Sequence, residues 1–473
     1  MRVYFLGIAG TAMGNAALLL RSLGHDVLGV DENVYPPMSD VLQKSGIAFR
    51  EGYDAERLAE CEPDLAVVGN VLSRGNPEVE WLLESRRVAY DSLPAVLRRM
   101  VLKDRKNIVV AGTHGKTTTT ALTAFLLRQN GYDPGFLIGG VPLDPPVGTY
   151  AGRSDHPFVI EGDEYDCAFF DKRSKFIHYA PQVAVLNNLE FDHADIFRDL
   201  DDVQRSFSHF LRLVPGNGAI IVNGDDENLK KLLPVPWTTV YTVGQHEAND
   251  LRIVSFTEST DGSRFDLVWK DELWGSVEWK QHGFYNARNA AAAALAAAWS
   301  VSPNQPAKFS ISGLSAFRGV RRRRETRFQS PNLTLIEDFG HHPTAIGETL
   351  KSLRNQYPEA YLIASFEPRS NTSRTRIFQE ALVPALSRAD RVVIAPVDRG
   401  DHLDSAARLD TAELASQLIL TGTDAEACGS YEESFQILRR ESNEPRSRPL
   451  VMTIFTNGSF GDIIEQLVKS IRD

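Results

Sequence analysis

Short apolar runs recur along the chain, and most of them end in glycine or in a polar cluster. Such runs are typical of strands buried on both faces of a parallel sheet. The predicted strands are Val3–Leu6, Val27–Val30, Leu65–Val68, Ile108–Ala111, Phe158–Ile160, Val183–Leu186, Ala219–Val222, Leu333–Ile336, Tyr361–Ser365, Arg391–Ala395 and Leu450–Phe455. Segments with helical spacing lie between them, at Asn15–Leu23, Ala121–Arg128 and the Ala-rich Ala287–Trp299. This alternation predicts an α/β fold.

The chain of 473 residues is too long for one ordinary core, so we expect more than one domain. The order of the motifs predicts three: a Rossmann-like domain over 1–106, a central P-loop ATPase-like domain over 107–319, and a second Rossmann-like domain over 320–473. Residues in the 250s to 270s alternate between polar and apolar, which predicts antiparallel strands within the central domain.

A glycine loop joins the strand Ile108–Ala111 to the helix that follows it. Its residues are Gly112, Thr113, His114, Gly115, Lys116, Thr117, Thr118 and Thr119. In such a loop, the backbone N–H groups and the helix N-terminus face a phosphate, Lys116 adds a positive charge, and Thr117 offers its hydroxyl to Mg²⁺. The usual spacing would place a glycine at Val110, so this is a shortened form. The loop predicts a nucleotide triphosphate site, and the alternative is an ordinary strand-to-helix turn.

A second glycine turn, Gly7–Gly14, follows the first predicted strand, and the next strand ends in Asp31. This arrangement is typical of dinucleotide-binding folds. The spacing is not G-x-G-x-x-G, so we expect a related diphosphate rather than a nicotinamide cofactor; an unoccupied crevice is the alternative. The loop Gly69–Pro77 is expected at the carboxyl edge of the same sheet, where ligands bind.

Acidic and imidazole side chains gather after two strands of the central domain, in Glu161–Asp166 and in Asn187–Asp195. Downstream of a phosphate loop, such clusters suit a hard cation beside polyphosphate. For Asp163, Asp166 and Asp195, helix capping and solvated turns remain an equal alternative.

The start of the third domain carries the run Arg321–Arg324, followed by Glu325. In an acidic chain beside a nucleotide site, we interpret these as arginines that clamp phosphate at a domain junction. The strand after them ends in Glu337–Pro343, which contains two adjacent histidines. We expect His341 and His342 to line a ligand rather than to share a metal ion.

Composition narrows the classes of function. The net charge of −11 argues against non-specific nucleic-acid binding, and the three cysteines are consistent with neither a disulfide framework nor a zinc site. The N-terminus shows no signal-peptide pattern, and the Ala-rich helix is too short to span a bilayer. We therefore expect a cytoplasmic enzyme with small-molecule partners, no nucleic acid and no membrane.

Taken together, the motifs resemble the Mur ligase family across the whole chain. The resemblance rests on Gly112–Thr119, Glu161, Asp192-His193, Gly283-x-x-Asn286-x-x-Asn289, the arginine run and Asp338-x-Gly340-His341-His342-Pro343. These ligases are three-domain, ATP-dependent enzymes of peptidoglycan synthesis that form amide bonds. Four further stretches, Asp31–Met38, Gly69–Pro77, Glu164–Phe176 and Glu367–Thr372, resemble the branch that adds a tripeptide during cell-wall recycling.

The resemblance implies ATP and Mg²⁺ as cofactors, and UDP-N-acetylmuramate and the tripeptide L-Ala-γ-D-Glu-meso-diaminopimelate as substrates. ATP would phosphorylate the lactyl carboxylate, and the amine of the tripeptide would attack the acyl phosphate. The alternative within the family is the branch that adds L-alanine. An alternative of another class is an idle nucleotide sensor, which the intact Lys116, Thr117, Glu161 and His193 disfavour.

The resemblance also implies roles for residues. The expected catalytic residues are Lys116, His114, Glu161, His193 and Arg323. The expected ATP-binding residues are Gly112, Thr113, His114, Gly115, Lys116, Thr117, Thr118, Asn289, Arg323 and Asp338. Thr117, Glu161 and His193 are the expected metal ligands. The expected substrate-binding residues are Gly7, Gly10, Met13, Asp31, Asn70, Ser73, Asn188, His341, His342, Arg369, Ser370 and Asn371.

The chain departs from the family pattern at two points. Many members carry a carbamylated lysine after the Asp-His motif, whereas here no lysine lies between Lys175 and Lys230. The histidine that usually precedes Asn286 is Tyr285. The sequence therefore predicts a metal site without lysine support and no imidazole at position 285.

Overall fold

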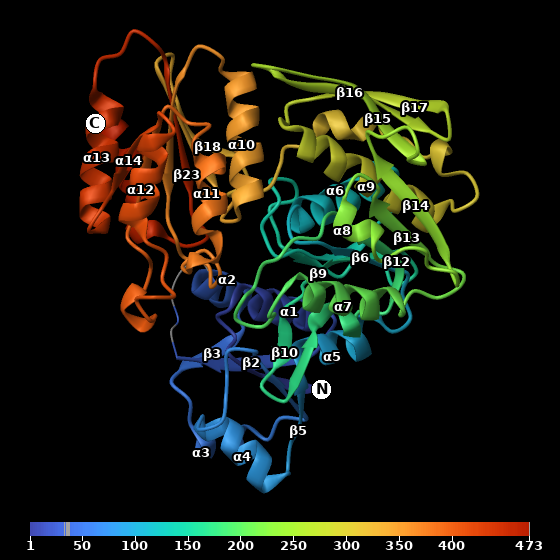
Figure 1. The fold of residues 1–473 in the computed structure, drawn as a ribbon. Helices are drawn as coiled ribbons and strands as arrows, with labels where there is room; N and C mark the ends of the chain where they lie inside the picture. Colours follow the sequence, from blue (N-terminus) through green and yellow to red (C-terminus); the bar gives the residue numbers. More distant parts are fainter. Residues whose placement is uncertain (33, 35–37, 473) are drawn as a thin grey trace.

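The computed structural model contains three large sheets that follow one another along the chain (Figure 1). It describes residues 1–32, 34 and 38–472. Asn33 and Tyr35–Pro37, part of one stretch that resembles the tripeptide branch, lie outside the described residues. Within the described part of the chain, no helix is both long and apolar enough to cross a membrane.

The first sheet has five strands in the order β3-β2-β1-β4-β5, and every neighbouring pair is parallel. Its strands are β1 (Arg2–Leu6), β2 (Asp26–Asp31), β3 (Ala48–Glu51), β4 (Leu65–Val68) and β5 (Ala89–Ser92). The helices around it are α1 (Thr11–Ser22), α2 (Met38–Ser45), α3 (Ala55–Cys61) and α4 (Pro77–Ser85). This is the predicted Rossmann-like arrangement, in which loops at the carboxyl ends of the strands face one edge.

The second sheet has ten strands in the order β17-β16-β15-β14-β13-β12-β6-β9-β7-β8. Its strands are β6 (Asn107–Ala111), β7 (Gly135–Leu137), β8 (Thr149–Tyr150), β9 (Phe158–Gly162), β12 (Pro181–Leu186), β13 (Ala219–Asn223), β14 (Thr239–Gly244), β15 (Leu251–Ser259), β16 (Gly262–Trp269) and β17 (Glu272–Trp279). The helices are α6 (Lys116–Gln129), α7 (Leu200–Leu211), α8 (Glu227–Lys230) and α9 (Phe284–Val301). The hairpin β10 (Asp166–Ala168) and β11 (Asp171–Ser174) stands apart. The predicted antiparallel strands are β15, β16 and β17.

The third sheet has six strands in the order β18-β19-β23-β20-β21-β22, and only the edge strand β18 is antiparallel to its neighbour. Its strands are β18 (Glu325–Gln329), β19 (Leu333–Asp338), β20 (Tyr361–Phe366), β21 (Arg391–Ile394), β22 (Asp424–Ala427) and β23 (Leu450–Phe455). The helices are α10 (Pro343–Gln356), α11 (Gln379–Leu386), α12 (Thr411–Leu420), α13 (Tyr431–Asn443) and α14 (Ile463–Arg472).

The predicted strands and helices all coincide with observed ones, but the three helices begin at Thr11, Lys116 and Phe284, each about one turn before the apolar spacing placed it. Helix α1 starts at Thr11. Its Gly14 packs closely against Met38, because a Cβ added to this glycine would lie 2.3 Å from the methionine sulfur. Helix α6 starts at Lys116, ahead of its apolar positions, and the hydroxyls of Thr120 and Thr123 donate to carbonyls one turn back. Small and threonine residues hide these first turns from an apolar-periodicity pattern.

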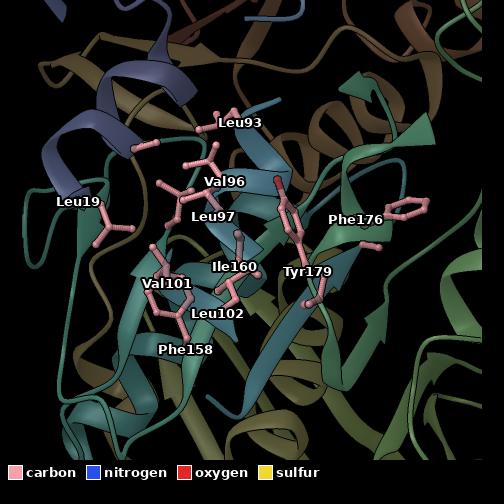
Figure 2. Close-up of a cluster of buried hydrophobic side chains, with 14 of the residues drawn as sticks. Leu19, Leu93, Val96, Leu97, Val101, Leu102, Phe158, Ile160, Phe176 and Tyr179 are labelled. Carbon is pink, nitrogen blue, oxygen red and sulfur yellow. The ribbon is translucent and has the colours of Figure 1, made fainter. Parts of the chain in front are cut away.

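The first two sheets share one apolar core. Helix α5 (Leu93–Leu97) and the π-helical turn Arg98–Leu102 carry leucines and valines that pack against Phe158, Ile160 and Tyr179 of the middle segment (Figure 2). Leu97 and Leu102 are at most 1% exposed. The third sheet instead packs its two faces with apolar clusters of its own. The first two units are thus joined by a continuous core, and the third is not.

Candidate functional site

A cavity of about 1100 Å³ lies where the middle and C-terminal units meet. The phosphate loop and the ends of β9 and β12 line one side, and residues after β19 and β20 line the other. All of these segments follow the carboxyl ends of parallel strands, which is where open α/β sheets bind ligands.

Glycines shape the phosphate loop at its two ends. Gly112 has φ 138° and Gly115 has φ 77°, and a Cβ on Gly115 would come within 2.6 Å of Asn289 Oδ1. The amide of Asn187 donates to Thr119 Oγ1 (2.9 Å), and Asn188 Oδ1 accepts the backbone N–H of His114 (2.7 Å). The end of β12 therefore braces the loop from below, and α9 touches it through Asn289.

Lys116 lies between its own loop and an acidic residue that motif reasoning did not single out. Its Nζ donates to Gly112 O (2.7 Å) and to both carboxylate oxygens of Glu164 (2.8 and 3.0 Å). Burial lowers the pKa of Lys116, but Glu164 and Asp163 offset it, and the pKa ends above its usual value. The ammonium is thus retained at the point where an anionic phosphate would be held.

His193 reaches the same carboxylate from the other side. Its Nε2 lies 3.0 Å from Glu164 Oε1, and its backbone N–H donates to Asp192 Oδ1 (2.8 Å). The residue has φ 57°, a left-handed backbone that a non-glycine residue rarely adopts. Burial by itself lowers the pKa of His193. Glu164 and Asp192 raise it by a larger amount, so the pKa lies above its usual value. Backbone strain at this position is consistent with a functional site.

Two of the predicted metal ligands, Thr117 and Glu161, are hydrogen-bonded to each other. Thr117 donates to Glu161 Oε1 (2.9 Å), and Arg323 Nη2 from the C-terminal unit donates to the same threonine hydroxyl (3.2 Å). Glu161 Oε2 accepts the N–H of Gly139 (2.8 Å). His193, the third expected ligand, instead contacts Glu164, so the structure divides the expected set between two neighbouring carboxylates.

His114 meets His342 of the C-terminal unit over a shared carboxylate. Glu190 Oε2 lies 2.8 Å from His114 Nε2 and 3.2 Å from His342 Nδ1. Burial raises the pKa of Glu190, but the hydrogen bond and charge of His114 lower it to about 2. Burial and the nearby His114 lower the pKa of His342 to about 3. This cluster joins the phosphate loop to the C-terminal unit.

The expected nucleotide contacts from the C-terminal half lie deeper in the cavity. Asp338 is 7% exposed, and its carboxylate accepts the backbone N–H groups of Gly340 (2.7 Å) and Arg324 (2.9 Å). Burial raises the pKa of Asp338. Phe284 lies under the guanidinium of Arg288, 5.1 Å from the ring centre, and both line the cavity. Asn289 follows Arg288 directly in α9.

The loop after β20 contacts the middle unit directly. Asn371 donates to Asp195 Oδ2 (2.8 Å) and to the Tyr165 hydroxyl (3.2 Å). Arg369 and Ser370 line the cavity, as do His341, Asn188 and Thr118. His341 Nε2 lies 3.6 Å from Asp192. The C-terminal residues expected at the substrate are thus gathered on one wall.

The N-terminal turn is a separate part of the site. Gly7 has φ 88°, and Asp31 Oδ2 accepts the N–H of Ala9 (2.8 Å), so Asp31 holds the glycine turn closed. Among the residues of this turn and its helix, Ala12 lines the large cavity. Gly7, Gly10, Met13, Asp31, Asn70 and Ser73 do not. They lie at the carboxyl edge of the five-stranded sheet, with Met13 buried and Ser73 exposed.

The three carboxylates left open by sequence reasoning all have protein partners. Asp163 pairs with Lys175 (2.6 Å), Asp166 pairs with Lys172 (2.5 Å), and Asp195 accepts from Tyr165 and Asn371. The residues that sequence reasoning passed over are Glu164 and Glu190. Each lies in an acidic cluster of the sequence. They differ from the other acidic residues only in the folded chain, where Lys116 and His193 contact Glu164, and His114 and His342 contact Glu190.

A phosphate loop on a parallel sheet, with an arginine from another domain beside it, is typical of enzymes that transfer phosphoryl groups from nucleotides.

Three family models match successive parts of the chain. The matching models are described as Mur ligase family, catalytic domain (residues 2–105), Mur ligase middle domain (110–297), and Mur ligase, glutamate ligase domain (322–452). The chain belongs to the Mur ligase family.

Individual relatives cover most or all of the chain. The UDP-N-acetylmuramate–L-alanyl-γ-D-glutamyl-meso-2,6-diaminoheptandioate ligase of Escherichia coli K12 is 43% identical, covering 100% of this chain and 98% of the relative. The crystal structure of a murein peptide ligase from Psychrobacter arcticus 273-4 has 35% identity and a TM-score of 0.73, covering 100% of this chain and 98% of that one. A UDP-N-acetylmuramate–L-alanine ligase of Desulfosudis oleivorans is 31% identical over 85% of this chain and 84% of the relative.

Proposed function

We propose that this Mur ligase joins the tripeptide L-Ala-γ-D-Glu-meso-diaminopimelate to UDP-N-acetylmuramate in peptidoglycan recycling, with ATP converted to ADP and phosphate. As a Mur ligase, it is an ATP-dependent enzyme that forms an amide bond. The observation that carries the proposal is the 43% identity to the Escherichia coli tripeptide ligase over the full chain. The alanine ligase of Desulfosudis oleivorans has a lower sequence identity, 31%, over 85% of this chain.

The reaction proceeds in two balanced steps. A lactyl carboxylate oxygen attacks the γ-phosphorus of ATP, and the bond from that phosphorus to the bridging oxygen breaks. ADP is released, and the carboxylate becomes an acyl phosphate. The tripeptide amine then attacks the acyl carbon, the C–N bond forms, phosphate leaves, and the amine loses a proton. In the first step two anions must approach each other, so positioning and electrostatic stabilisation are the main catalytic resources.

The cationic residues of the cavity suit the first step. Lys116 keeps its charge, and we assign it to the β- and γ-phosphates beside the loop Gly112–Thr118. Arg323, already hydrogen-bonded to Thr117, is assigned to the γ-phosphate. We assign His114 to a position near the reacting carboxylate. Asn289 and Asp338 are assigned to the adenine and the ribose.

The oxygen donors fit Mg²⁺, which prefers carboxylate and hydroxyl ligands. Thr117 and Glu161 already share a hydrogen bond, and Asp163 and Glu164 beside them are each paired with a lysine. We assign Thr117, Glu161 and His193 as the protein ligands of the ion. To bind it, His193 would give up its hydrogen bond to Glu164. When bound, the ion neutralises charge on the phosphates and the carboxylate.

The remaining assignments divide the substrates between domains. We propose domain boundaries near residues 106 and 320, with the UDP end of the donor at Gly7, Gly10, Met13, Asp31, Asn70 and Ser73. The acceptor and the muramoyl part are assigned to Asn188, His341, His342, Arg369, Ser370 and Asn371. An acceptor with several carboxylates needs a cationic partner, and Arg369 lines the cavity.

An acceptor competition assay tests the function. With ATP, Mg²⁺ and UDP-N-acetylmuramate present, phosphate release should be faster with the tripeptide than with L-alanine. Faster release with L-alanine would support the alanine ligase instead. ADP release that depends on both the UDP-sugar and an amine would rule out an idle nucleotide sensor, whereas no ADP release with all substrates present would contradict both ligase functions.

A Lys116→Ala variant tests the division of the site. Turnover should be abolished because the phosphate loop loses its buried cation, whereas UDP-N-acetylmuramate binding, measured by calorimetry, should stay within about threefold of wild type because it rests on the first domain. Loss of both together would contradict the proposed partition.

A further inference from the structure

Two histidines and a glutamate from three segments converge at the seam between the middle and C-terminal units. His114 comes from the phosphate loop, Glu190 follows β12, and His342 caps the N-terminus of α10. One ligand atom from each lies within 4.8 Å of the other two. The rings of the two histidines are 4.4 Å apart between centres. His342 is buried, whereas His114 and Glu190 are partly exposed, so the cluster can be reached from solvent.

The hydrogen bonds around His342 identify which of its nitrogens carries the proton. Nε2 lies 3.3 Å from the carbonyl oxygen of Phe191, which can only accept, so Nε2 is the donor. Nδ1 then carries the ring's one in-plane lone pair, which accepts the N–H of Thr344 in a long hydrogen bond (3.3 Å). Glu190 Oε2 lies 3.2 Å from the same nitrogen. Two acceptors at this distance repel each other unless a proton or a metal ion lies between them.

One of the two separations is that of neighbouring ligands in a metal coordination shell, and the other is shorter by about 0.5 Å. Ligands at about 2.0–2.1 Å from a tetrahedral zinc ion are about 3.3 Å apart. The observed separations from Glu190 Oε2 are 2.8 Å to His114 Nε2 and 3.2 Å to His342 Nδ1. Two imidazoles and one carboxylate favour Zn²⁺ and similar transition metals over Mg²⁺, most of whose ligands are oxygen atoms.

We propose that His114, Glu190 and His342 form a binding site for a Zn²⁺-class divalent ion, distinct from the Mg²⁺ ligands assigned above. The carboxylate is held in place by its other oxygen, which accepts from the Thr344 hydroxyl (3.0 Å). Because His342 belongs to the C-terminal unit and the other two to the middle unit, the ion fastens the two units together. The proposal does not depend on which amine the enzyme accepts.

A second cluster, Cys167, Asp171 and His178, has similar spacing but is less suited to a metal. Asp171 is already bound by two nitrogens of Arg173 (2.8 Å each) and by His178 (2.8 Å). The thiol of Cys167 donates to Arg173 O (3.1 Å). A metal there would have to displace an arginine and deprotonate a buried thiol, so this cluster serves as a control.

Co²⁺ binding to the full-length protein tests the site. In excess Mg²⁺ and without nucleotide, Co²⁺ should give saturable visible absorption bands and raise the melting temperature. Glu190→Gln and His342→Gln should each weaken Co²⁺ binding at least about tenfold. His341→Gln and His193→Gln, matched changes in neighbouring imidazoles, should leave Co²⁺ affinity within about threefold of wild type.

Three results would overturn the proposal. The first is the absence of saturable Co²⁺ bands in the wild-type protein. The second is unchanged Co²⁺ affinity in Glu190→Gln and His342→Gln, each checked for folding by circular dichroism. The third is a sulfur-to-cobalt charge-transfer band that disappears in Cys167→Ser, which would place the ion at the other cluster.

Discussion

At the scale of single residues, the site is a set of charges that control one another. Lys116 keeps its proton because Glu164 is beside it, and Glu164 in turn is shared with His193. Sequence motifs identified the lysine and the histidine but not the glutamate. The reason is physical: Glu164 is 48 residues from Lys116, and no local pattern encodes that contact.

Among the titrating residues, His282 should make stability depend on pH near neutrality. Burial and the charge of Arg324 lower its pKa from 6.5 to about 4. Between these two values the unfolded chain takes up a proton that the folded chain does not, so stability falls as pH falls from about 6.5 towards 4. His282→Gln should reduce the loss between pH 7 and pH 5 by on the order of 1 kcal/mol, allowing for solvent screening.

Urea unfolding at several pH values measures this effect, with pH 8 as the reference at which His282 is neutral in both states. A variant that loses as much stability as the wild type between pH 7 and pH 5 would contradict the assignment.

At the scale of elements, the functional side chains follow the carboxyl ends of strands. The phosphate loop follows β6, Glu161 ends β9, Asn187 and Asn188 follow β12, and Asp338 ends β19. Apolar periodicity located these strands, so it also located the loops that carry the chemistry. What it did not locate were the first turns of α1 and α6, because glycine and threonine are poor helix signals.

The two glycines that flank α6 offer a matched test of the loop. Gly115 has φ 77° and a Cβ there would meet Asn289 and Asn187, whereas Gly131 has φ 80° and nothing within 4 Å. Gly131→Ala should cost about 1 kcal/mol of backbone strain alone. Gly115→Ala should cost more and weaken ATP binding at least about tenfold, because the loop must move.

Melting temperatures and ATP affinity by calorimetry measure the two glycine variants. Equal losses of stability with ATP affinity preserved in both would show that Asn187 and Asn289 do not constrain the loop.

At the scale of the whole molecule, the three sheets are not equally connected. One apolar core runs through the first and second units (Figure 2). The third unit has separate cores. Polar contacts at the seam, such as Arg323 with Thr117 and Asn371 with Asp195, join the third unit to the second. Polar contacts are weaker than a shared apolar core, so we expect the C-terminal unit to be the part that moves.

Two buried leucines test this division. Leu97 lies in the shared core and Leu382 lies in the core of the third unit, and both are at most 1% exposed. Each change to alanine should cost about 2–5 kcal/mol. In differential scanning calorimetry, Leu97→Ala should lower the transition of the first two units, and Leu382→Ala should lower that of the third. A single transition lowered equally by both would show one cooperative unit.

The sequence by itself determined the strand order along the chain, the phosphate loop and the family, because these depend on local periodicity, on glycine backbone freedom and on residue spacing. The tertiary structure alone decided which charges meet. Lys116 and His193 converge on Glu164, and His114 and His342 converge on Glu190, across separations from 29 to 152 residues. Such contacts depend on how strands pair and domains pack, and these are properties of the whole folded chain rather than of any segment.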